Sequence, residues 1–265
     1  MTRKLPTIAD LRARKGKGQL TMLRYFSLEE AAAAEEAGID IASVPDDILT
    51  HPDYRKVAPS IFSMTGMDHR GAGTRDDYLR YSGKMLMAGA DALYCSAGLG
   101  TVEYLAKEHI PIVGHVGLVP SRATWTGGFR AVGKTAESAL ALYEEVKAYE
   151  NAGAFAVEIE VVPVEVATEI SKRVNILLWS MGSGPGCDAQ YLFAEDILGT
   201  NRGHMPRHSK VYRNFAAEFD RLQQERIAAF REYCDDVETG RYPENQHVVS
   251  MAEEELDAFR ARIGS

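Results

Sequence analysis

The sequence predicts an α/β fold of the TIM (β/α)8 barrel type, with an N-terminal helix and a long C-terminal helix. Short apolar runs alternate with helical patterns roughly eight times, which is typical of parallel βα repeats. The length of 265 residues suits such a barrel, which typically takes about 250 residues. No low-complexity linker divides the sequence, so we expect one barrel domain over residues 1–265.

The first half of the sequence predicts four strands, at 20–23, 39–44, 59–64 and 90–95. Residues 7–11 predict a capped N-terminal helix before the first strand. Ser27 and Glu30 form the spacing of a capping box, and they predict the start of an alanine-rich helix that ends at Gly38. A further helix is predicted over 75–88, before Gly89.

The second half predicts strands at 110–113, 154–160 and 176–180, with a weaker last strand near Ile197. On these bounds His115 comes just after the fifth strand. Helices are predicted over 135–151 and 214–238. A glycine-containing loop over 120–134 precedes the first of them.

Composition narrows the class of protein. A net charge of −8 without a dense basic face argues against general nucleic-acid binding. No uncharged apolar stretch reaches the roughly 18 residues that span a bilayer, so no membrane partner is expected. The three cysteines have no close spacing, which predicts reduced thiols, a cytoplasmic location and no zinc site.

Glu160 is the leading catalytic candidate, because it closes the apolar run 154–160. Barrel enzymes place their chemistry at the carboxyl ends of the strands. Apolar surroundings raise the pKa of a carboxyl group, and a raised pKa suits a general base. The alternative is that Glu160 forms a structural ion pair.

Other polar residues fall on the same rim of the predicted barrel. Asp46, Asp47 and Asp68 offer oxygen ligands for Mg²⁺ or another divalent metal, although loop acids are often simply solvated. His115, between glycines, suits a hydrogen-bonding role in the site, although a lone histidine is often structural. The glycine loop 182–186 is either a substrate loop or a tight turn.

Several motifs carry a resemblance to a known family, in family order over more than half of the chain. They are GHVGLVP at 114–120, GGFRAVG at 127–133, IEVVPVE at 159–165, GSGPGCDAQ at 182–190, GHMP at 203–206, Lys210, Asn214 with Phe215, and GRYP at 240–243. With these motifs the chain resembles ketopantoate hydroxymethyltransferase (3-methyl-2-oxobutanoate hydroxymethyltransferase), in the phosphoenolpyruvate mutase/isocitrate lyase superfamily.

The resemblance implies a TIM barrel that uses Mg²⁺ to chelate a 2-oxo acid and to stabilise the enolate formed at C3. It implies that Glu160 is the base and that 5,10-methylenetetrahydrofolate supplies the one-carbon unit in pantothenate biosynthesis. Family members assemble into homo-oligomers, often decamers, so the resemblance also implies a homo-oligomer.

The resemblance gives further residues a role. Asp46 matches a metal ligand, Asp47 stands where the family has a substrate-binding Ser, and Gly182 and Gly184 are expected to contact the substrate. In an alignment without gaps, the second metal-binding Asp of the family corresponds to Gly66. Asp68 takes its place only if the alignment shifts locally. A Lys-x-Glu motif at the end of the fourth strand becomes 94–96, so Tyr94 and Ser96 are the expected substrate contacts there.

These departures leave three hypotheses open. The first is hydroxymethyl transfer to 3-methyl-2-oxobutanoate or a related 2-oxo acid. The second is another reaction of the superfamily that forms or cleaves a C–C bond of a different 2-oxo acid. The third is a non-catalytic relative that keeps the barrel for binding or assembly.

Overall fold

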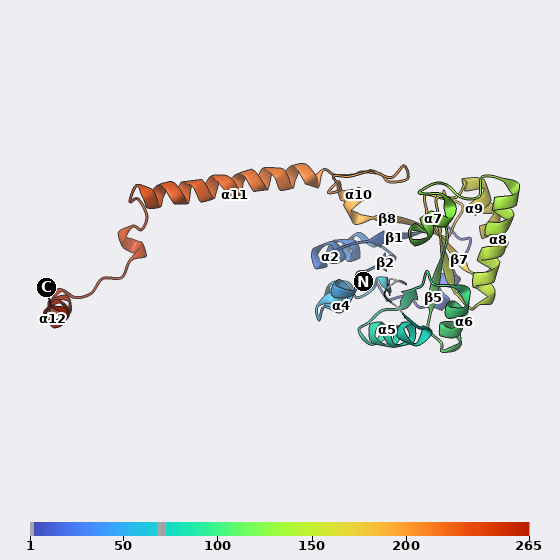
Figure 1. Cartoon of the computed structure of the whole chain (residues 1–265), viewed down its shortest axis with the longest axis horizontal. Coiled ribbons are helices and arrows are strands. Elements are labelled where there is room, and N and C mark those ends of the chain that lie inside the picture. The colour runs from blue at the N-terminus through green and yellow to red at the C-terminus, as the bar shows by residue number, and fades with distance from the viewer. Residues whose placement is uncertain (1–2, 68–70, 72, 265) are drawn as a thin grey trace. The chain divides into compact units, whose positions relative to one another are not determined.

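The predicted barrel is confirmed. The computed structural model describes residues 3–67, 71 and 73–264, and its eight parallel strands pair in chain order, with β8 closing onto β1 (Figure 1). The strands are β1 Leu20–Arg24, β2 Ile41–Ser43, β3 Phe62–Gly66, β4 Ala92–Tyr94, β5 Ile112–Gly117, β6 Ala156–Glu160, β7 Leu177–Met181 and β8 Ala189–Phe193.

Helices follow most of the strands and lie outside the barrel (Figure 1). Side-chain capping fixes several of their starts: Thr7 with Asp10, Thr74 with Asp77 and Thr135 with Ser138 form capping boxes. The helical elements are α1 Ile8–Arg12, α2 Leu28–Ala37, α3 Asp46–Leu49, α4 Tyr54–Val57, α5 Arg75–Met87, α6 Leu99–Lys107, η1 Pro120–Arg122, α7 Ala123–Thr126, α8 Ala136–Asn151, α9 Val164–Ser171, α10 Ala194–Leu198, α11 Phe215–Glu238, η2 Asn245–His247 and α12 Glu253–Ile263.

Two apolar layers show which way each strand residue points. Alternate residues of a strand face opposite sides of the sheet. On β6, Val157 and Ile159 pack in the layer between strands and helices, whereas Ala156 packs in the barrel interior. The same alternation places Val113 of β5 and Met22 of β1 in the interior. Side chains two residues further along these strands therefore face the barrel axis.

Three sequence predictions need correction. The last strand does not run through Ile197, which lies in α10; β8 starts at Ala189, three residues after the end of the glycine loop 182–186. Gln190 interrupts the apolar run that marks the other strands. Residue 189 pairs with Trp179 in the middle of β7. Residues 182–188 join the two parallel strands without the helix that usually connects such strands.

The other two corrections are local. His115 lies inside β5 rather than after it, because the strand continues through both glycines to Gly117. The Ser27 hydroxyl accepts from the Glu30 amide as predicted, but the Glu30 carboxylate accepts from the amide of Phe26, so the box is not reciprocal.

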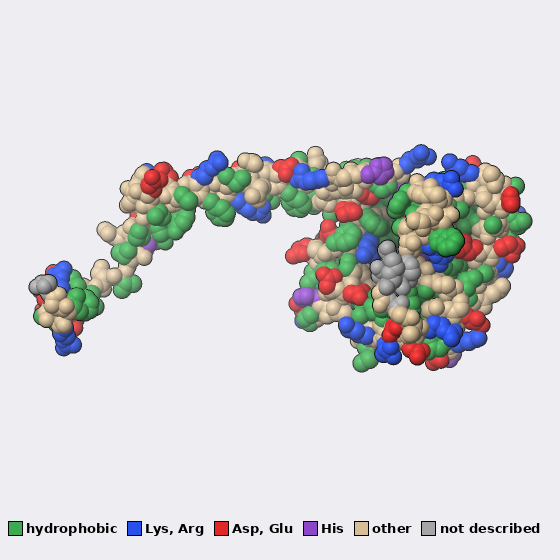
Figure 2. Space-filling model, viewed as in Figure 1, with side chains coloured by type: hydrophobic (Ala, Val, Ile, Leu, Met, Phe, Trp, Pro, Cys, Tyr) green, Lys and Arg blue, Asp and Glu red, His purple; other side chains and the backbone are tan. Residues whose placement is uncertain are grey.

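The chain forms two compact units, Met1–Arg213 and Asn214–Ser265. The barrel occupies the first unit. In the second, α11 is amphipathic, and large apolar side chains gather along it (Figure 2). None of the described residues of 214–265 is buried, and the exposed ones on α11 include Phe215, Phe219, Leu222, Phe230, Tyr233 and Val237. Among the residues described, no helix has the length and apolar content to cross a membrane.

Candidate functional site

Three ionisable side chains meet inside the barrel on the neighbouring strands β5 and β6. Glu158 and Glu160 share the inward face of β6, and His115 of β5 is the register partner of Glu158. Nε2 of His115 lies 3.0 Å from Oε2 of Glu160 and 3.8 Å from Oε1 of Glu158. All three residues are buried, so the barrel interior holds a compact group that can exchange protons.

Burial sets the protonation of this group. It raises the pKa of Glu160 from 4.5 to about 7. Burial also raises the pKa of Glu158, with a further increase from the nearby Glu160 charge. For His115, burial lowers the pKa, although the Glu158 charge acts in the opposite direction. A carboxyl group with a pKa of about 7 is matched to accepting a proton near neutral pH.

The backbone around Glu160 is held in an unusual conformation. Val161 has a φ of 50°, in the left-handed region that a β-branched residue rarely adopts. The buried Ser183 hydroxyl donates to the carbonyl of Ile159 at 2.8 Å and accepts from the amide of Val162 at 3.0 Å. Ser183, from the glycine loop after β7, therefore pins the turn on both sides of Glu160.

Tyr94 also faces the interior, where its ring meets the His115 ring edge-on with centroids 5.6 Å apart. Tyr94 as a whole is partly buried, and burial of its hydroxyl and the charge of Glu158 raise its pKa well above 10. Gly66 is the register partner of Tyr94 on β3. A Cβ at residue 66 would lie 2.7 Å from the Tyr94 carbonyl oxygen. A carboxylate at position 66 is thus sterically incompatible with this arrangement.

Asp46 and Asp47 lie beyond the end of β2, in the first turn of α3, and both are exposed. Oδ1 of Asp46 accepts from the Thr65 hydroxyl at 2.5 Å and from the Tyr81 hydroxyl at 2.6 Å. Asp68 lies outside the described residues, so the predicted pairing of Asp46 with Asp68 stays a prediction.

The remaining predicted contacts follow the strands directly. Ser96 follows β4, and its carbonyl accepts from Arg122 at 2.8 Å. Gly182, with a φ of 69°, faces the His208 ring, and Gly184, with a φ of 85°, faces Val164. The positive φ and the close packing therefore explain why glycine occupies both positions. A substrate contact at Ser96, Gly182 or Gly184 stays a prediction.

The chain matches the sequence profile of a known family over most of its length. A sequence profile described as ketopantoate hydroxymethyltransferase matches residues 56–245, which include the whole His115, Glu158 and Glu160 group. The chain belongs to the ketopantoate hydroxymethyltransferase family. The predicted hydroxymethyltransferase class is thereby confirmed at the level of the family.

Relatives named 3-methyl-2-oxobutanoate hydroxymethyltransferase are similar over nearly their whole length. The protein of Pyrobaculum aerophilum is 34% identical, over 88% of this chain and 95% of that protein. Enzyme 1 of Methylibium petroleiphilum is 30% identical, over 97% and 93% of the two chains. A putative phosphonomutase from Burkholderia cenocepacia shares the fold, with a TM-score of 0.55, 9% identity and coverage of 72% of this chain and 93% of that one.

Two places in this family member offer metal ligands. In the described part of the chain, His115, Glu158 and Glu160 form the one group of three possible ligands, with ligand atoms within 4.8 Å of one another. Its nitrogen donor suits transition metals better than Mg²⁺. Asp46 instead presents oxygen only, and the two hydroxyls on Oδ1 orient it as outer partners orient metal-binding carboxylates. Asp46 therefore fits Mg²⁺, which often binds one or two carboxylates together with waters and substrate.

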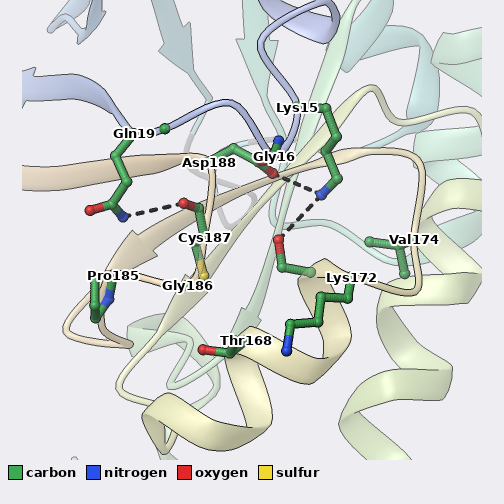
Figure 3. A pocket seen from close by; sticks show the side chains of 12 residues that line it. Lys15, Gly16, Gln19, Thr168, Lys172, Val174, Pro185, Gly186, Cys187 and Asp188 are labelled. Carbon is green, nitrogen blue, oxygen red and sulfur yellow. Dashed lines mark hydrogen bonds and ion pairs between the residues drawn. The ribbon is translucent and has the colours of Figure 1, made fainter.

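One cavity lies at the opposite end of the strands from Glu160. It has a volume of about 450 Å³ and is lined by residues that precede β1, β7 and β8 (Figure 3). Inside it, Nζ of Lys15 lies 2.8 Å from the buried carboxylate of Asp188, which also accepts from the Leu178 amide. Burial raises the pKa of Cys187 to about 12. That pKa leaves the thiol protonated and makes a nucleophilic role unfavourable.

Two residues of the site escaped the sequence prediction. Glu158 stands two residues before Glu160, and strand alternation places both carboxylates on one face, which is a signal the sequence carries. Ser183 has no such signal, because its contacts with 159–162 depend on the packing of the glycine loop against β6.

Proposed function

We propose that this protein transfers a one-carbon unit from 5,10-methylenetetrahydrofolate to C3 of 3-methyl-2-oxobutanoate or a related branched 2-oxo acid. The observation that carries the proposal is the buried Glu160 carboxyl group, with a pKa near 7 and His115 at 3.0 Å. Membership of the family supports the reaction class.

Glu160 acts as the general base in this proposal. Its carboxylate takes the proton from C3, and the electron pair left behind is delocalised onto the 2-oxo oxygen. A divalent cation such as Mg²⁺, held at Asp46 when bound, would stabilise that negative charge as a Lewis acid. Water hydrolyses 5,10-methylenetetrahydrofolate, which breaks both C–N bonds of the methylene bridge and releases tetrahydrofolate and formaldehyde. C3 then attacks the formaldehyde carbon, and the carbonyl oxygen takes back the proton held by Glu160 to become the hydroxyl group. Tetrahydrofolate and the hydroxymethylated 2-oxo acid are the products.

His115 supports the base in the proposed mechanism. The imidazole lies within hydrogen-bond distance of Glu160, and its lowered pKa keeps it neutral near pH 7. A neutral ring can exchange a proton with the carboxyl group without adding a charge to the buried site. Tyr94 packs against the same ring and limits its movement.

The experiment uses the whole protein with 3-methyl-2-oxobutanoate, Mg²⁺ and 5,10-methylenetetrahydrofolate. Proton NMR of the mixture should show a new hydroxymethyl resonance, with formation of an equal amount of tetrahydrofolate. Loss of the 2-oxo acid without incorporation of the one-carbon unit would contradict the transfer reaction.

A second candidate is another C–C bond reaction on a different 2-oxo acid. The Tyr94 and Gly66 pair favours it, because these residues change the β3 and β4 wall of the site together. Turnover of another 2-oxo acid without folate, in a screen of such acids, would select this alternative over hydroxymethyl transfer.

We also propose that the protein assembles as a homo-oligomer, a decamer by family resemblance. The support within this chain is the row of exposed apolar side chains on α11, since patches of this kind mark interaction surfaces. The cytoplasmic location and the role in pantothenate biosynthesis are proposals of the same standing, based on the family.

A further inference from the structure

Arg24 is the one arginine or lysine in the eight strands of the barrel. It ends β1 and lies on the same face as Leu20 and Met22, both of which pack in the barrel interior. Its side chain thus enters the carboxyl-terminal half of the interior, where His115, Glu158 and Glu160 also lie. A half-buried cation in this position needs an explanation, because the interior of a barrel is otherwise an apolar core.

Neutral partners hold the guanidinium group. Nη1 donates to the Ser43 hydroxyl at 2.8 Å, and the guanidinium carbon lies 5.4 Å from the centre of the Phe26 ring. Hydrogen bonding and the positive charge of Arg24 also lower the pKa of Tyr191 against the larger effect of burial. Throughout the described ranges, no carboxylate forms an ion pair with Arg24. Several of its N–H donors therefore remain available to an anion.

Two other cations close to the barrel, Arg122 and Lys15, have partners already. Arg122 lies 3.4 Å from the Glu145 carboxylate and donates to the carbonyl of Ser96. Lys15 is paired with Asp188 at the opposite end of the strands. At the end of β4, Tyr94 occupies the interior position, and its phenol side chain carries no positive charge.

We propose that Arg24 binds the carboxylate of the 2-oxo acid substrate. The inference rests on the proposed function and names the cation that this function requires. A guanidinium group presents paired donors that match both oxygens of a carboxylate. The substrate would lie with its carboxylate toward β1 and β2 and with C3 toward Glu160 on β6.

Electrostatics are consistent with this orientation. The charge of Arg24 reaches across the interior and lowers the pKa of Glu158 against the effect of burial. A competing explanation is therefore that Arg24 only balances the charge of Glu158. The two explanations predict different substrate selectivity. A carboxylate-binding residue discriminates a 2-oxo acid from a neutral ketone, whereas a charge-balancing residue does not.

The test compares Arg24→Gln, Arg24→Lys and wild-type protein in C3–H exchange with solvent deuterium. The substrates are 3-methyl-2-oxobutanoate and the neutral ketone 3-methyl-2-butanone. Arg173→Gln is the matched control, because the side chain of this exposed arginine pairs with Glu169 on α9, outside the barrel. For Arg24→Gln we expect KM for the acid to rise by about 10- to 150-fold, the loss of a charged hydrogen bond, with kcat nearly unchanged.

The KM of Arg24→Lys for the acid should lie between those of wild-type protein and Arg24→Gln, because lysine keeps the positive charge but lacks the paired donors of arginine. The kcat/KM for the ketone should be the same in all variants. An equal loss of kcat/KM for acid and ketone, or no loss for either, would overturn the proposal. Thermal melting checks that each variant is folded.

Calorimetric binding of 3-methyl-2-oxobutanoate separates this inference from the proposed function. Weaker binding to Arg24→Gln supports the role of Arg24 even if the wild-type protein catalyses no exchange. Absence of exchange by the wild-type protein would contradict only the proposed reaction. Equal binding to wild-type and variant would overturn the role of Arg24 while leaving the reaction standing.

Discussion

Nε2 of His115 and Oε2 of Glu160 lie 3.0 Å apart inside the barrel, and both side chains are buried. The two residues come from adjacent strands and are held in register by the β5–β6 pairing. This pair, at the carboxyl end of the strands, links the fold to the proposed proton abstraction.

The raised pKa of Glu160 predicts the pH dependence of the reaction. A base must be ionised, so kcat/KM for C3–H exchange should rise about tenfold per unit below pH 7 and level off above it. A pH profile of the exchange rate, measured by NMR, checks this. A profile that is flat from pH 5 to 8 would rule out Glu160 as the titrating base.

The same pKa predicts a stability effect. The carboxyl group binds its proton more tightly in the folded protein (pKa about 7) than in the unfolded chain (4.5). Its contribution to stability is therefore fully present below pH 4.5 and is lost as the pH rises through 7. Glu160→Gln should remove a cost of up to about 3 kcal/mol above pH 7. Denaturant unfolding at pH 5 and pH 8 measures the free energy of unfolding of variant and wild type. If the two proteins differ by the same amount at both pH values, the raised pKa of Glu160 is contradicted.

Ser183→Ala should reduce catalysis through the position of Glu160. The variant loses the hydrogen bonds that pin Ile159 and Val162, so we expect kcat to fall while KM changes little. Stability should fall by about 1–3 kcal/mol. Ser171→Ala is the control, since Ser171 is also buried but lies by Lys15 at the other end of the strands. Similar kcat values for the two variants would argue against a positioning role.

Asp46→Asn should raise the Mg²⁺ concentration needed for exchange, because it halves the charge available from 46 and 47. Glu158→Gln serves as the comparison, as Glu158 belongs to the other group of possible ligands. Titration of exchange activity with Mg²⁺ measures both variants. If only Glu158→Gln changes the titration, the metal is held by the β5–β6 group and not by Asp46.

Charges on the apolar face of α11 should disrupt assembly. Phe219 and Phe230 are exposed on this face, and replacing both with Glu would place charges in the proposed interface. We expect a lower molar mass in light scattering after size exclusion. Gln224→Glu, on another face of the helix, is the control and should keep the wild-type mass. A monomeric wild-type protein would contradict the proposed oligomer.

The sequence predicted the barrel and most strands because apolar runs and capping residues act locally. Thr7 with Asp10 is an example, as the spacing alone predicts the hydrogen bonds that form. The strand near Ile197 was wrong because β8 depends on its stagger against Trp179, which no local pattern shows. Pairing register also decides that Gly66 faces Tyr94.

Part of the candidate site was predictable, because it too depends on a local sequence pattern. Glu160 could be found from its own segment, at the end of an apolar run. Its contact with His115 requires the neighbouring strand, and Arg24 requires the whole barrel to close, because β1 reaches the site only through its pairing with β2 and β8. Contacts between distant segments are thus the part that sequence patterns miss.

The most direct test of the central claim is exchange of the C3 proton of 3-methyl-2-oxobutanoate in deuterium oxide, with Mg²⁺ and without folate. Wild-type protein should catalyse the exchange, and folded Glu160→Gln should be slower by about 10²- to 10⁴-fold, the usual contribution of a general base. Exchange at the wild-type rate in Glu160→Gln, or none with folded wild-type protein, would contradict the assignment of Glu160 as the base.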